Sequence, residues 1–510
     1  MIKLRIGTSM STYMLDEACV NEYKIPLIVL MENAVLSATR HMDSELYNSY
    51  VIVSGTGNNG GDGLGIARQL VSKVKKVKVF IIGNMDKITS CSKINYEILK
   101  SMNIPIEIID SKNPDEMKIN LLKEEIKNSD IVIDAIFGTG LEREIRYIFK
   151  DIINIINIYK KLTYSIDVPS GINSSNGEIL GTCIKADKTI CFEFYKRGFL
   201  KYEVKEYIGE VIVEHLGIPE YILEKYDNKE FITSLELVRM HIKEKNKYSF
   251  KSDFGKVAVF AGSKGFSGAA FIASESAVKS GSGLVTLVSD EYVQNIASCK
   301  LIEGMTLNFN QKEKINRLIK SCNAIGFGCG MGNNDTTLEL LRSTLEGSTC
   351  TIVIDADGLN VLNNNCDILS SHKNRIVITP HLGEMSKLTE KSITYIRDNK
   401  IDVAKEFAKE YGVIVLLKGY ETVITDGNMT YINPTGNSAM ANGGMGDCLL
   451  GMITSFIGQG MNNLYATVCA AYIHGYIGDH LAKELYTINA SDVIKNIPLI
   501  MKQLSIEINL

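Results

Sequence analysis

The chain has 510 residues and a formal net charge of −4, from 55 lysines and arginines against 59 aspartates and glutamates. This near-balance gives no support to binding of nucleic acid or of a membrane surface, both of which attract basic proteins. Hydrophobic residues make up 45% of the chain and charged residues 22%, as in ordinary soluble globular proteins. The length exceeds what one hydrophobic core usually holds and predicts two domains, or three.

The cysteines indicate a reducing environment. There are 11 of them, none in a C-x-x-C pair, and several lie in apolar runs, such as Cys191 and Cys469. Reduced, buried thiols in a cytoplasmic protein fit this distribution better than a disulfide framework or a zinc site. The first residues contain no continuous apolar segment, so we expect no signal peptide. No apolar run is long enough to span a bilayer.

Short β-branched runs alternate with amphipathic stretches from about residue 50 onward. This alternation predicts an α/β fold in both halves, with parallel sheets covered by helices on both faces. Ligands of such sheets bind at the carboxyl ends of the strands. The expected strands are 50–53, 77–82, 131–137 and 163–168 in the first half, and 256–260, 283–288, 324–327, 351–354, 375–378 and 413–417 in the second.

The domain boundary is expected within the segment 220–254, which is charged, lacks glycine and has weak periodicity. We place the two domains at 1–222 and 232–506. The lysine-rich piece 243–247 is interpreted as a solvated linker.

A glycine-rich segment near the C-terminus carries the strongest chemical signal. Gly443, Gly444 and Gly446 precede Asp447 and the apolar run 448–453. The glycines leave the backbone free to curl around an anion, and the apolar run predicts a buried helix whose N-terminus favours phosphate. A bound phosphate would repel a carboxylate, so Asp447 indicates a general base and not a simple helix cap.

A second glycine-rich turn, 54–63, lies between an expected strand and an expected helix. Its glycines permit close approach to a phosphate, and its asparagine and aspartate oxygens can bind a hard cation. An ordinary tight turn is the alternative interpretation. Two further strands end in an acid, Asp134 before Gly138 and Asp167 before a Pro-Ser-Gly turn, and these favour a site.

Four motifs of the first half resemble, as an ordered set, the YjeF N-terminal family of NAD(P)H-hydrate epimerases over nearly all of residues 1–220. They are Leu30-Met-Glu-Asn-Ala34, Asn58-Asn-Gly-Gly-Asp62, Asp134-Ala-Ile-Phe-Gly-Thr-Gly140 and Asp167-Val-Pro-Ser-Gly171. The resemblance implies a Rossmann-like three-layer domain. One departure is Val35, where the family usually has glycine; no site assignment rests on it.

The same resemblance implies the roles of individual residues in this domain. Asp167 would serve acid–base chemistry, because epimerisation at a hemiaminal carbon requires the hydroxyl group to leave and return. The implied K⁺ ligands are Asn59, Asp134 and Ser170. The implied contacts to the hydrated cofactor are Asn58, Asn59, Gly60, Gly61, Asp62, Gly138, Thr139, Gly140, Leu141, Glu142, Arg143, Glu144 and Asp167.

Four elements of the second half resemble the ribokinase-like superfamily, and within it the ADP/ATP-dependent NAD(P)H-hydrate dehydratases, over roughly 240–505. They are Gly262-Ser-Lys-Gly-Phe-Ser-Gly-Ala-Ala270, Gly328-Cys-Gly-Met-Gly332, Thr379-Pro-His-Leu-Gly-Glu384, and Lys418-Gly-Tyr-Glu-Thr422 with the later Gly446-Asp447. The resemblance implies a ribokinase-like α/β domain that uses Mg²⁺ with ADP or ATP. It implies hydrated-cofactor contacts at Ala269, Gly330, His381 and Asp447, and nucleotide contacts at Lys418, Gly419, Tyr420, Glu421, Thr422 and Gly446.

Taken together, the two resemblances imply one chain with two enzymes of one repair pathway. The first would interconvert the R and S hydrates of NADH and NADPH. The second would phosphorylate the S hydrate and eliminate phosphate; we expect ADP, giving AMP. The expected partners are the hydrated cofactors and an adenine nucleotide, with a homo-oligomer as the assembly. The alternatives are a C-terminal vitamin or thiazole kinase, and an N-terminal module that binds a dinucleotide without catalysis.

Overall fold

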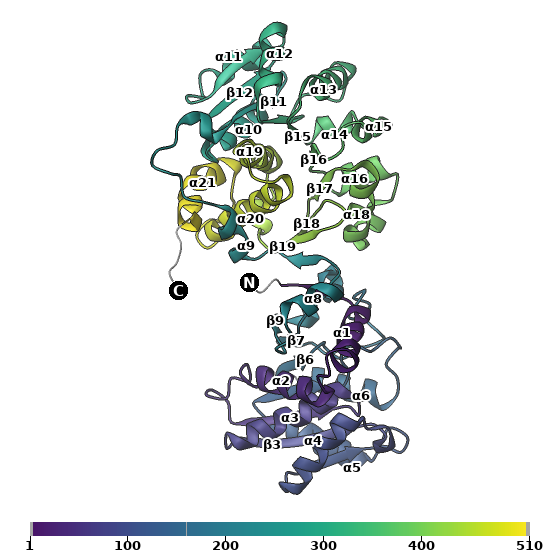
Figure 1. Cartoon of the computed structure of the whole chain (residues 1–510). Coiled ribbons are helices and arrows are strands. Elements are labelled where there is room, and N and C mark those ends of the chain that lie inside the picture. Colours follow the sequence, from purple (N-terminus) through teal and green to yellow (C-terminus); the bar gives the residue numbers. More distant parts are fainter. Residues whose placement is uncertain (1–3, 160, 506–510) are drawn as a thin grey trace. The chain divides into compact units, whose positions relative to one another are not determined.

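The computed structural model describes residues 4–159 and 161–505, which divide into two compact units, 1–230 and 231–510 (Figure 1). The division lies between the expected limits 222 and 232. The lysine-rich piece 243–247 is exposed and follows β10 (Glu230–Ile232) and α9 (Leu235–His241) in the chain. It therefore lies inside the second unit and does not join the two units.

The first unit contains, among its described residues, a seven-stranded sheet in the order β4-β3-β2-β5-β6-β7-β9, with every neighbouring pair parallel. Its strands are β2 (Ser49–Ser54), β3 (Lys76–Ile82), β4 (Ile106–Ile109), β5 (Ile131–Ala135), β6 (Leu162–Ile166), β7 (Lys188–Phe192) and β9 (Glu210–Glu214), and β1 (Ile6–Gly7) pairs separately with β8 (Tyr195–Lys196). Its helices are α1 (Ser9–Asn21), α2 (Leu27–Thr39), α3 (Asn58–Ser72), α4 (Ser90–Ser101), α5 (Glu116–Asn128), α6 (Ile148–Ile158), α7 (Lys205–Ile208) and α8 (Glu220–Tyr226).

The second unit contains a sheet in the order β10-β19-β18-β17-β16-β15-β14-β11-β12-β13, parallel from β13 to β17 and antiparallel at β17-β18-β19. Its further strands are β11 (Lys256–Phe260), β12 (Leu284–Ser289), β13 (Met305–Asn308), β14 (Ala324–Phe327), β15 (Thr351–Ile354), β16 (Ile376–Ile378), β17 (Ile414–Leu417), β18 (Thr422–Thr425) and β19 (Thr430–Asn433). Its further helices are α10 (Ser267–Lys279), α11 (Glu291–Ala297), α12 (Lys312–Ser321), α13 (Asp335–Gly347), α14 (Asp357–Asn360), α15 (Asp367–Ser370), α16 (Leu382–Thr389), α17 (Ile393–Asp398), α18 (Lys400–Tyr411), α19 (Met445–Gly458), α20 (Asn463–Leu481) and α21 (Ala490–Ser505).

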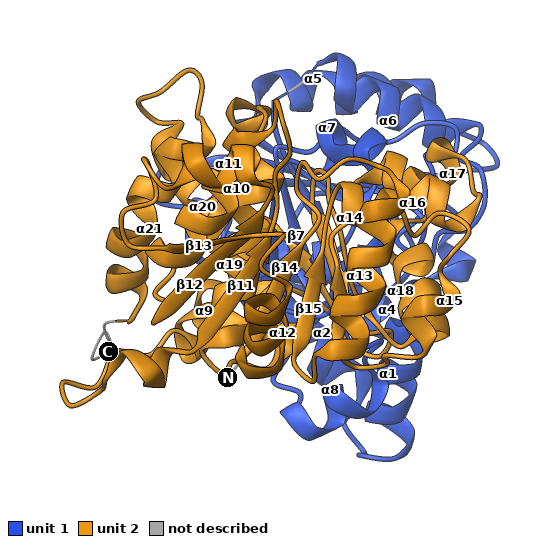
Figure 2. Ribbon diagram, turned by 90° about the horizontal axis from the view of Figure 1, so that it is seen from above, with its two compact units in different colours: residues 1–230 blue, residues 231–510 orange. Residues whose placement is uncertain are grey.

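The apolar strands are continuous because helices cover both faces of each sheet. In β5, three successive residues, Ile131, Val132 and Ile133, are fully buried although their side chains alternate between the two faces. In the second unit, Figure 2 shows α10, α20 and α21 on one side of the strands and α13, α16 and α18 on the other. The helices follow from their apolar spacing: α6 buries Ile148, Ile152 and Ile156 at intervals of four residues.

Val35, the one noted departure from the family pattern, fits the first unit through a neighbouring glycine. Val35 is fully buried on α2, and a Cβ at Gly65 of α3 would lie 2.4 Å from one of its methyl carbons. The absence of a side chain at Gly65 therefore makes room for the larger residue on α2. The substitution changes the packing of two helices and leaves the glycine-rich turn before α3 intact.

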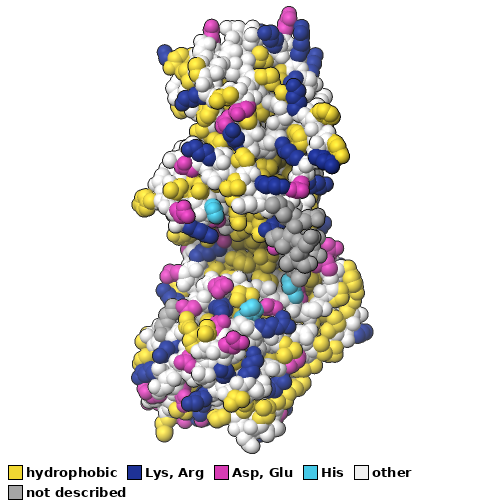
Figure 3. All heavy atoms as spheres, turned by 90° about the vertical axis from the view of Figure 1, so that its left-hand side faces the viewer, with side chains coloured by type: hydrophobic (Ala, Val, Ile, Leu, Met, Phe, Trp, Pro, Cys, Tyr) yellow, Lys and Arg dark blue, Asp and Glu magenta, His cyan; other side chains and the backbone are white. Residues whose placement is uncertain are grey.

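The surface and the helices agree with the composition. On the face shown in Figure 3, basic and acidic side chains are intermixed with uncharged surface in both units. Among the residues that the structure describes, none of the helices combines the length and the apolarity that crossing a bilayer requires.

Strand β10 is expected to be essential to the second unit. Phe231 is 4% exposed, and its ring centroid lies 5.5 Å from that of Tyr431. We expect Phe231→Ala in a fragment 228–510 to lower the free energy of unfolding in urea by about 3–5 kcal/mol, as for loss of a buried phenyl ring. The matched control is Tyr248→Ala at a residue that is 73% exposed, where a change within about 0.5 kcal/mol is expected. An equal effect of the two substitutions would contradict this role of β10.

Candidate active sites

The first site lies where the strand order of the N-terminal sheet reverses. Strands β2 and β5 are neighbours, yet β2 leads to β3 on one side and β5 leads to β6 on the other. Loops that leave such a pair diverge and form a crevice at the carboxyl ends of the strands. A cavity of about 930 Å³ occupies this place, lined by residues that follow β2, β5 and β6 and by residues of α1.

The glycine-rich turn shapes one wall of this cavity. Helix α3 begins directly after Gly57, and a Cβ on Gly60 would lie 2.0 Å from the carbonyl oxygen of Gly55. Only glycine fits there, so the first turn of α3 packs against its own preceding loop. The helix N-terminus thus faces the cavity with the positive end of its dipole, as an anionic cofactor requires.

The three predicted K⁺ ligands differ in their hydrogen bonding. Asp134 is fully buried and accepts hydrogen bonds from the Ser170 hydroxyl at 2.6 Å, the Ser170 amide at 2.8 Å and the Ser165 hydroxyl at 2.8 Å. Burial raises the pKa of Asp134, and these hydrogen bonds oppose that effect. Asn59 is 9% exposed, and neither its amide oxygen nor its amide nitrogen has a hydrogen-bond partner within the described residues. An unpaired, buried amide oxygen fits a ligand for a hard cation.

Asp167 lies at the end of β6 in a strained backbone conformation. Its φ angle is +66°, a region that residues other than glycine rarely adopt. One carboxylate oxygen lies 2.6 Å from the ammonium group of Lys196, which is itself fully buried. The other oxygen accepts hydrogen bonds from the Thr139 amide at 2.9 Å and the Thr139 hydroxyl at 2.6 Å. Burial alone would raise the pKa of Asp167, but the charge of Lys196 and these hydrogen bonds hold it below its usual value.

Most of the residues predicted to contact the cofactor in this unit line the cavity, and three do not. Gly60 packs against Gly55 of the turn and Gly61 against Ser92 and Met31. Glu144 faces the surface, where it accepts a hydrogen bond from Arg146 at 2.7 Å. The residues that do line it are Asn58, Asn59, Asp62, Gly138, Thr139, Gly140, Leu141, Glu142, Arg143 and Asp167. The turn glycines therefore act through the backbone shape.

Lys196 and two acids of this site were not predicted from the sequence. Asp16 of α1 and Glu193 line the cavity, and Lys196 lies buried behind Asp167. Lys196 is held by the pairing of β8 with β1, in which it lies opposite Gly7. The only signal in the sequence is its place after an apolar strand, between a tyrosine and an arginine. Asp16 comes from a helix that precedes every predicted motif, so its distance along the chain concealed it.

The second site lies at the corresponding reversal, between β11 and β14. Gly444 has a φ angle of +89°, and a Cβ there would lie 2.7 Å from the side chain of Ile272. Helix α19 begins at the next residue and is buried from Cys448 to Gly458. Asp447 occupies its first turn and accepts a hydrogen bond from the thiol of Cys329. Burial and the charge of Asp355 raise the pKa of Asp447, while the Cys329 bond and Lys418 oppose this.

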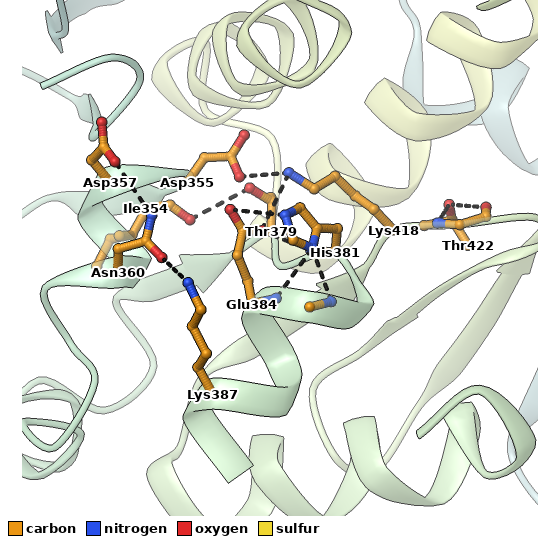
Figure 4. A network of polar contacts seen from close by, with 12 residues as sticks. Ile354, Asp355, Asp357, Asn360, Thr379, His381, Glu384, Lys387, Lys418 and Thr422 are labelled. Carbon is orange, nitrogen blue, oxygen red and sulfur yellow. Dashed lines mark hydrogen bonds and ion pairs between the residues drawn. The ribbon is translucent and has the colours of Figure 1, made fainter. Parts of the chain in front are cut away.

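Figure 4 shows a network of polar and charged groups in which Lys418 contacts Asp355, and the charges of both residues act on Asp447. The Lys418 ammonium group lies 2.6 Å from one carboxylate oxygen of Asp355 and 3.9 Å from Glu384. Burial would lower the pKa of Lys418, but Asp355 and Glu384 raise it above the ordinary value. A Cβ at Gly446 would lie 3.1 Å from Asp355 and 3.4 Å from Lys418. The absence of a side chain there brings the start of α19 against this ion pair.

His381 has a structural role that leaves one ring nitrogen for a ligand. Its Nδ1 accepts hydrogen bonds from the amides of Gly383 at 2.9 Å and Glu384 at 3.1 Å, which caps α16. In a neutral ring, Nε2 then carries the proton and can donate it. Nε2 lies 3.6 Å from a carboxylate oxygen of Glu384, and the side chain is 59% exposed, so a ligand can also reach this donor.

The remaining predicted contacts fall into two groups. Ala269 and Gly330 are adjacent, since a Cβ at Gly330 would lie 3.2 Å from that of Ala269. Gly419, Tyr420, Glu421 and Thr422 form the turn from β17 to β18, where the Thr422 hydroxyl donates to the Gly419 carbonyl at 3.0 Å. Tyr420 is 61% exposed. An isolated bridge pairs His381 with Lys418 and joins this turn to α16.

Comparisons with known proteins agree with this architecture. A family model described as NAD(P)H-hydrate dehydratase matches residues 257–499, and one described as YjeF-related protein N-terminus matches residues 27–198. The chain is 32% identical to a bifunctional NAD(P)H-hydrate repair enzyme of Moorella thermoacetica, over 97% of this chain and 96% of that protein. It is 34% identical to a protein of the same name from Thermofilum pendens, over 92% and 91%.

A solved ribokinase-like superfamily protein of Enterococcus faecalis resembles the structure with a TM-score of 0.52 and 25% identity, covering 54% of this chain and 97% of that one. The chain belongs to the family of bifunctional NAD(P)H-hydrate repair enzymes. The predicted family, the two α/β folds and the assignment as a bifunctional enzyme are therefore confirmed. The alternative of a vitamin kinase fused to a binding module is not favoured.

The ion pair between Lys418 and Asp355 is expected to stabilise the second unit. The Asp355 side chain is 3% exposed, so removal of the lysine leaves a buried charge unpaired. We expect Lys418→Met to lower the free energy of unfolding by about 3–5 kcal/mol, measured in urea, and addition of Asp355→Asn to recover most of it. The control is Lys391→Met, since Lys391 pairs with Glu406 at the surface and a cost below about 1 kcal/mol is expected. If the double variant is no more stable than the single one, the explanation is wrong.

Proposed function

We propose that each unit carries out one reaction in the repair of hydrated NADH and NADPH. The N-terminal unit would interconvert the R and S hydrates. The C-terminal unit would use an adenine nucleotide to convert the S hydrate back to the reduced cofactor. The observation that carries this proposal is the place of Asp447, a carboxylate on the first turn of a buried helix that opens on three glycines.

In the C-terminal reaction, Asp447 would take the proton of the substrate hydroxyl group as its oxygen attacks the terminal phosphoryl group of the nucleotide. Burial and the charge of Asp355 raise the pKa of Asp447, which makes the carboxylate a stronger base. The backbone amides at Gly443–Gly446 and the ammonium group of Lys418 would stabilise the charge of the transferring group. Loss of the phosphate ester then restores the nicotinamide ring, because phosphate leaves more readily than hydroxide.

Mg²⁺ bound with the nucleotide would supply further charge neutralisation. The carboxylates of Asp355 and Glu384 are oxygen donors of the kind that Mg²⁺ prefers, and we assign neither of them as a direct ligand. The family resemblance favours ADP, giving AMP. Incubating the S hydrate with ADP or with ATP, and following the return of the reduced-nicotinamide absorbance, would distinguish the donors.

We expect Asp447→Asn to reduce nucleotide-dependent dehydration by about 10²–10⁴-fold, the usual loss on removing a general base. The asparagine keeps the size of the side chain, so the melting temperature should not fall. The measurement is the initial rate of NADH recovery from the S hydrate. A rate within a few-fold of the parent would remove Asp447 from the mechanism. Accumulation of a stable phosphorylated product, in place of free phosphate, would support a kinase.

In the N-terminal reaction, the ionised Asp167 would lie against the ring that loses and regains its hydroxyl group. Asn59, Asp134 and Ser170 would hold a K⁺ ion, because they offer only oxygen ligands and a single full charge. The unpaired amide of Asn59 supports this assignment. The ion would help to neutralise the phosphates of the cofactor. The homo-oligomer and the cytoplasmic location remain predictions.

The K⁺ assignment predicts an effect on both stability and activity. Raising K⁺ should raise the melting temperature of the N-terminal unit, since a ligand present at 100 times its dissociation constant stabilises by about 2.7 kcal/mol. Replacing K⁺ by tetramethylammonium should slow epimerisation. Asn59→Ala and Asp134→Asn should weaken both responses and leave the C-terminal reaction unchanged. If the stability and the epimerisation rate of the parent ignore the exchange of cation, the assignment fails.

A further inference from the structure

The cavity of the N-terminal unit is lined by more acidic side chains than the proposed K⁺ ion and the proposed role of Asp167 require. Within residues 4–159 and 161–505, five acidic side chains line it: Glu142 is exposed, and the four that are more enclosed are Asp16, Asp62, Asp167 and Glu193. Two of these acids have a basic partner among the described residues, Lys196 for Asp167 and His215 for Glu193. Their hydrogen bonds differ, and this difference separates the four acids into distinct roles.

Two of the four acids have their oxygens engaged. Asp167 pairs with Lys196 through one oxygen and accepts two hydrogen bonds from Thr139 through the other. Glu193 accepts a hydrogen bond from the Leu216 amide at 2.5 Å and lies 3.0 Å from the ring of His215. Both are therefore held in place as hydrogen-bond acceptors. A carboxylate bound in this way is a poor source of protons.

Asp62 differs from both. It is 9% exposed, on the second turn of α3, and its carboxyl group makes no hydrogen bond or ion pair with any residue that the structure describes. The charged groups that act on it are Asp167 and Asp16, both acidic. Burial, and then the repulsion of these two carboxylates, raise the pKa of Asp62 well above its usual value. Burial and the neighbouring like charges both favour the protonated form of this acid.

Asp16 is the remaining acid. It is half-buried on α1, and burial and the charge of Asp167 raise its pKa to about 6, against an opposing effect of Lys196. Asp16 is thus partly ionised near neutral pH, and it is less enclosed than Asp62. It is the main competitor for any role that requires a proton.

We propose that Asp62 is the group that gives a proton to the departing hydroxyl group and takes one back, while Asp167, held by Lys196, stabilises the positive charge that develops on the ring. The proposal rests on the epimerase function of this unit and names a residue for one of its steps. Two carboxyl groups in one pocket can take the roles of acid and charge stabiliser when their surroundings differ. Here Asp62 is enclosed without a hydrogen-bond partner among the described residues, and Asp167 is paired with the ammonium group of Lys196.

Asp62 donates one proton during this reaction and recovers one by its end. The bond between the ring carbon and the hydroxyl oxygen breaks, its electron pair stays on oxygen, and the proton of Asp62 converts the group into water. The ring nitrogen supplies the electron pair that forms a double bond to the same carbon, which becomes planar. Water adds to the opposite face, and its proton returns to Asp62 through water in the cavity. No oxidant, reductant or nucleotide is consumed.

The test uses the full-length chain, because its C-terminal reaction reports on folding in the same sample. The R hydrate of NADH is supplied without nucleotide, and appearance of the S hydrate is followed by chromatography. We expect Asp62→Asn to lower kcat of epimerisation by about 10²–10³-fold, with a small change in KM and an unchanged rate of S-hydrate dehydration. Asp62→Glu should recover part of the loss, and Asp16→Asn should cost less than tenfold.

A stability measurement separates a proton-transfer role from a structural one. Because the pKa of Asp62 is raised on folding, its ionisation disfavours the folded state. The parent should therefore lose stability relative to Asp62→Asn as the pH rises from the unfolded-state pKa, about 4, through the folded-state pKa. A structural Asp62 would give a less stable asparagine variant at every pH.

The possible failures are distinguishable. An epimerisation rate of Asp62→Asn within fivefold of the parent overturns the proposal, and so does a collapse of activity in Asp16→Asn alone. Loss of stability in Asp62→Asn at all pH values also overturns it. If the parent itself does not convert the R hydrate, the proposed function of this unit falls, and the role of Asp62 falls with it.

Discussion

Both candidate sites depend on the same constraint of parallel sheets. When two neighbouring strands lead to opposite sides of a sheet, the loops at their carboxyl ends diverge and leave a crevice. In the first unit these strands are β2 and β5; in the second they are β11 and β14. Counted from the strand at the reversal, both sheets run in the order 3-2-1-4-5-6-7 before the second adds antiparallel strands. Different chemistry is thus built at equivalent places on one topology.

The two units also use the same electrostatic device. In each, an aspartate that follows a strand lies 2.6 Å from a lysine on or directly after another strand: Asp167 with the fully buried Lys196, and Asp355 with the partly buried Lys418. A positive φ angle accompanies both, at Asp167 itself and at Ala356 after Asp355. Such a backbone costs about 1–3 kcal/mol at each position and persists only when the surroundings enforce it. The ion pair is one of the interactions that enforce it, since it fixes the direction of the carboxylate.

The sequence predicted the parts of these sites that are local in the chain. Glycines beside acids identified the turns before α3 and α19. In each turn a side chain would collide with a neighbouring group, as at Gly60 and Gly444, which explains why glycine occurs there. Ten of the parallel strands that the structure describes were predicted because burial on both faces produces continuous apolar runs, whereas the parallel strands β4, β7, β9 and β13 were not predicted. The antiparallel strands β18 and β19 were not predicted, since short strands at one side of a sheet carry a weak pattern.

The contacts that could not be predicted join residues that are far apart in the chain. Lys196 reaches Asp167 only because β8 pairs with β1 and directs the lysine inward. Asp16 reaches the cavity only because α1 packs against α2 and α8. Neither contact has a characteristic spacing, so no motif could indicate it. The lysine-rich piece 243–247 shows the opposite error: its composition correctly predicted exposure, but composition does not reveal which side of a boundary a loop occupies.

The groups left unsatisfied around the first site explain why its cavity needs a rigid frame. Asn59 and Asp62 are both nearly buried, and both lack partners for polar atoms in the described structure. Each such group costs about 1–3 kcal/mol when no ligand is present. A flexible loop would escape this cost by turning these side chains toward water. Here both residues lie on the first two turns of α3, and the rest of this helix is buried through Leu64, Ile66 and Leu70. Burial of these apolar side chains fixes the helix and so keeps Asn59 and Asp62 in the cavity despite their unfavourable desolvation. Ligands that satisfy these groups should therefore stabilise the unit as they bind, which links recognition of the cofactor to the burial of the helix behind it.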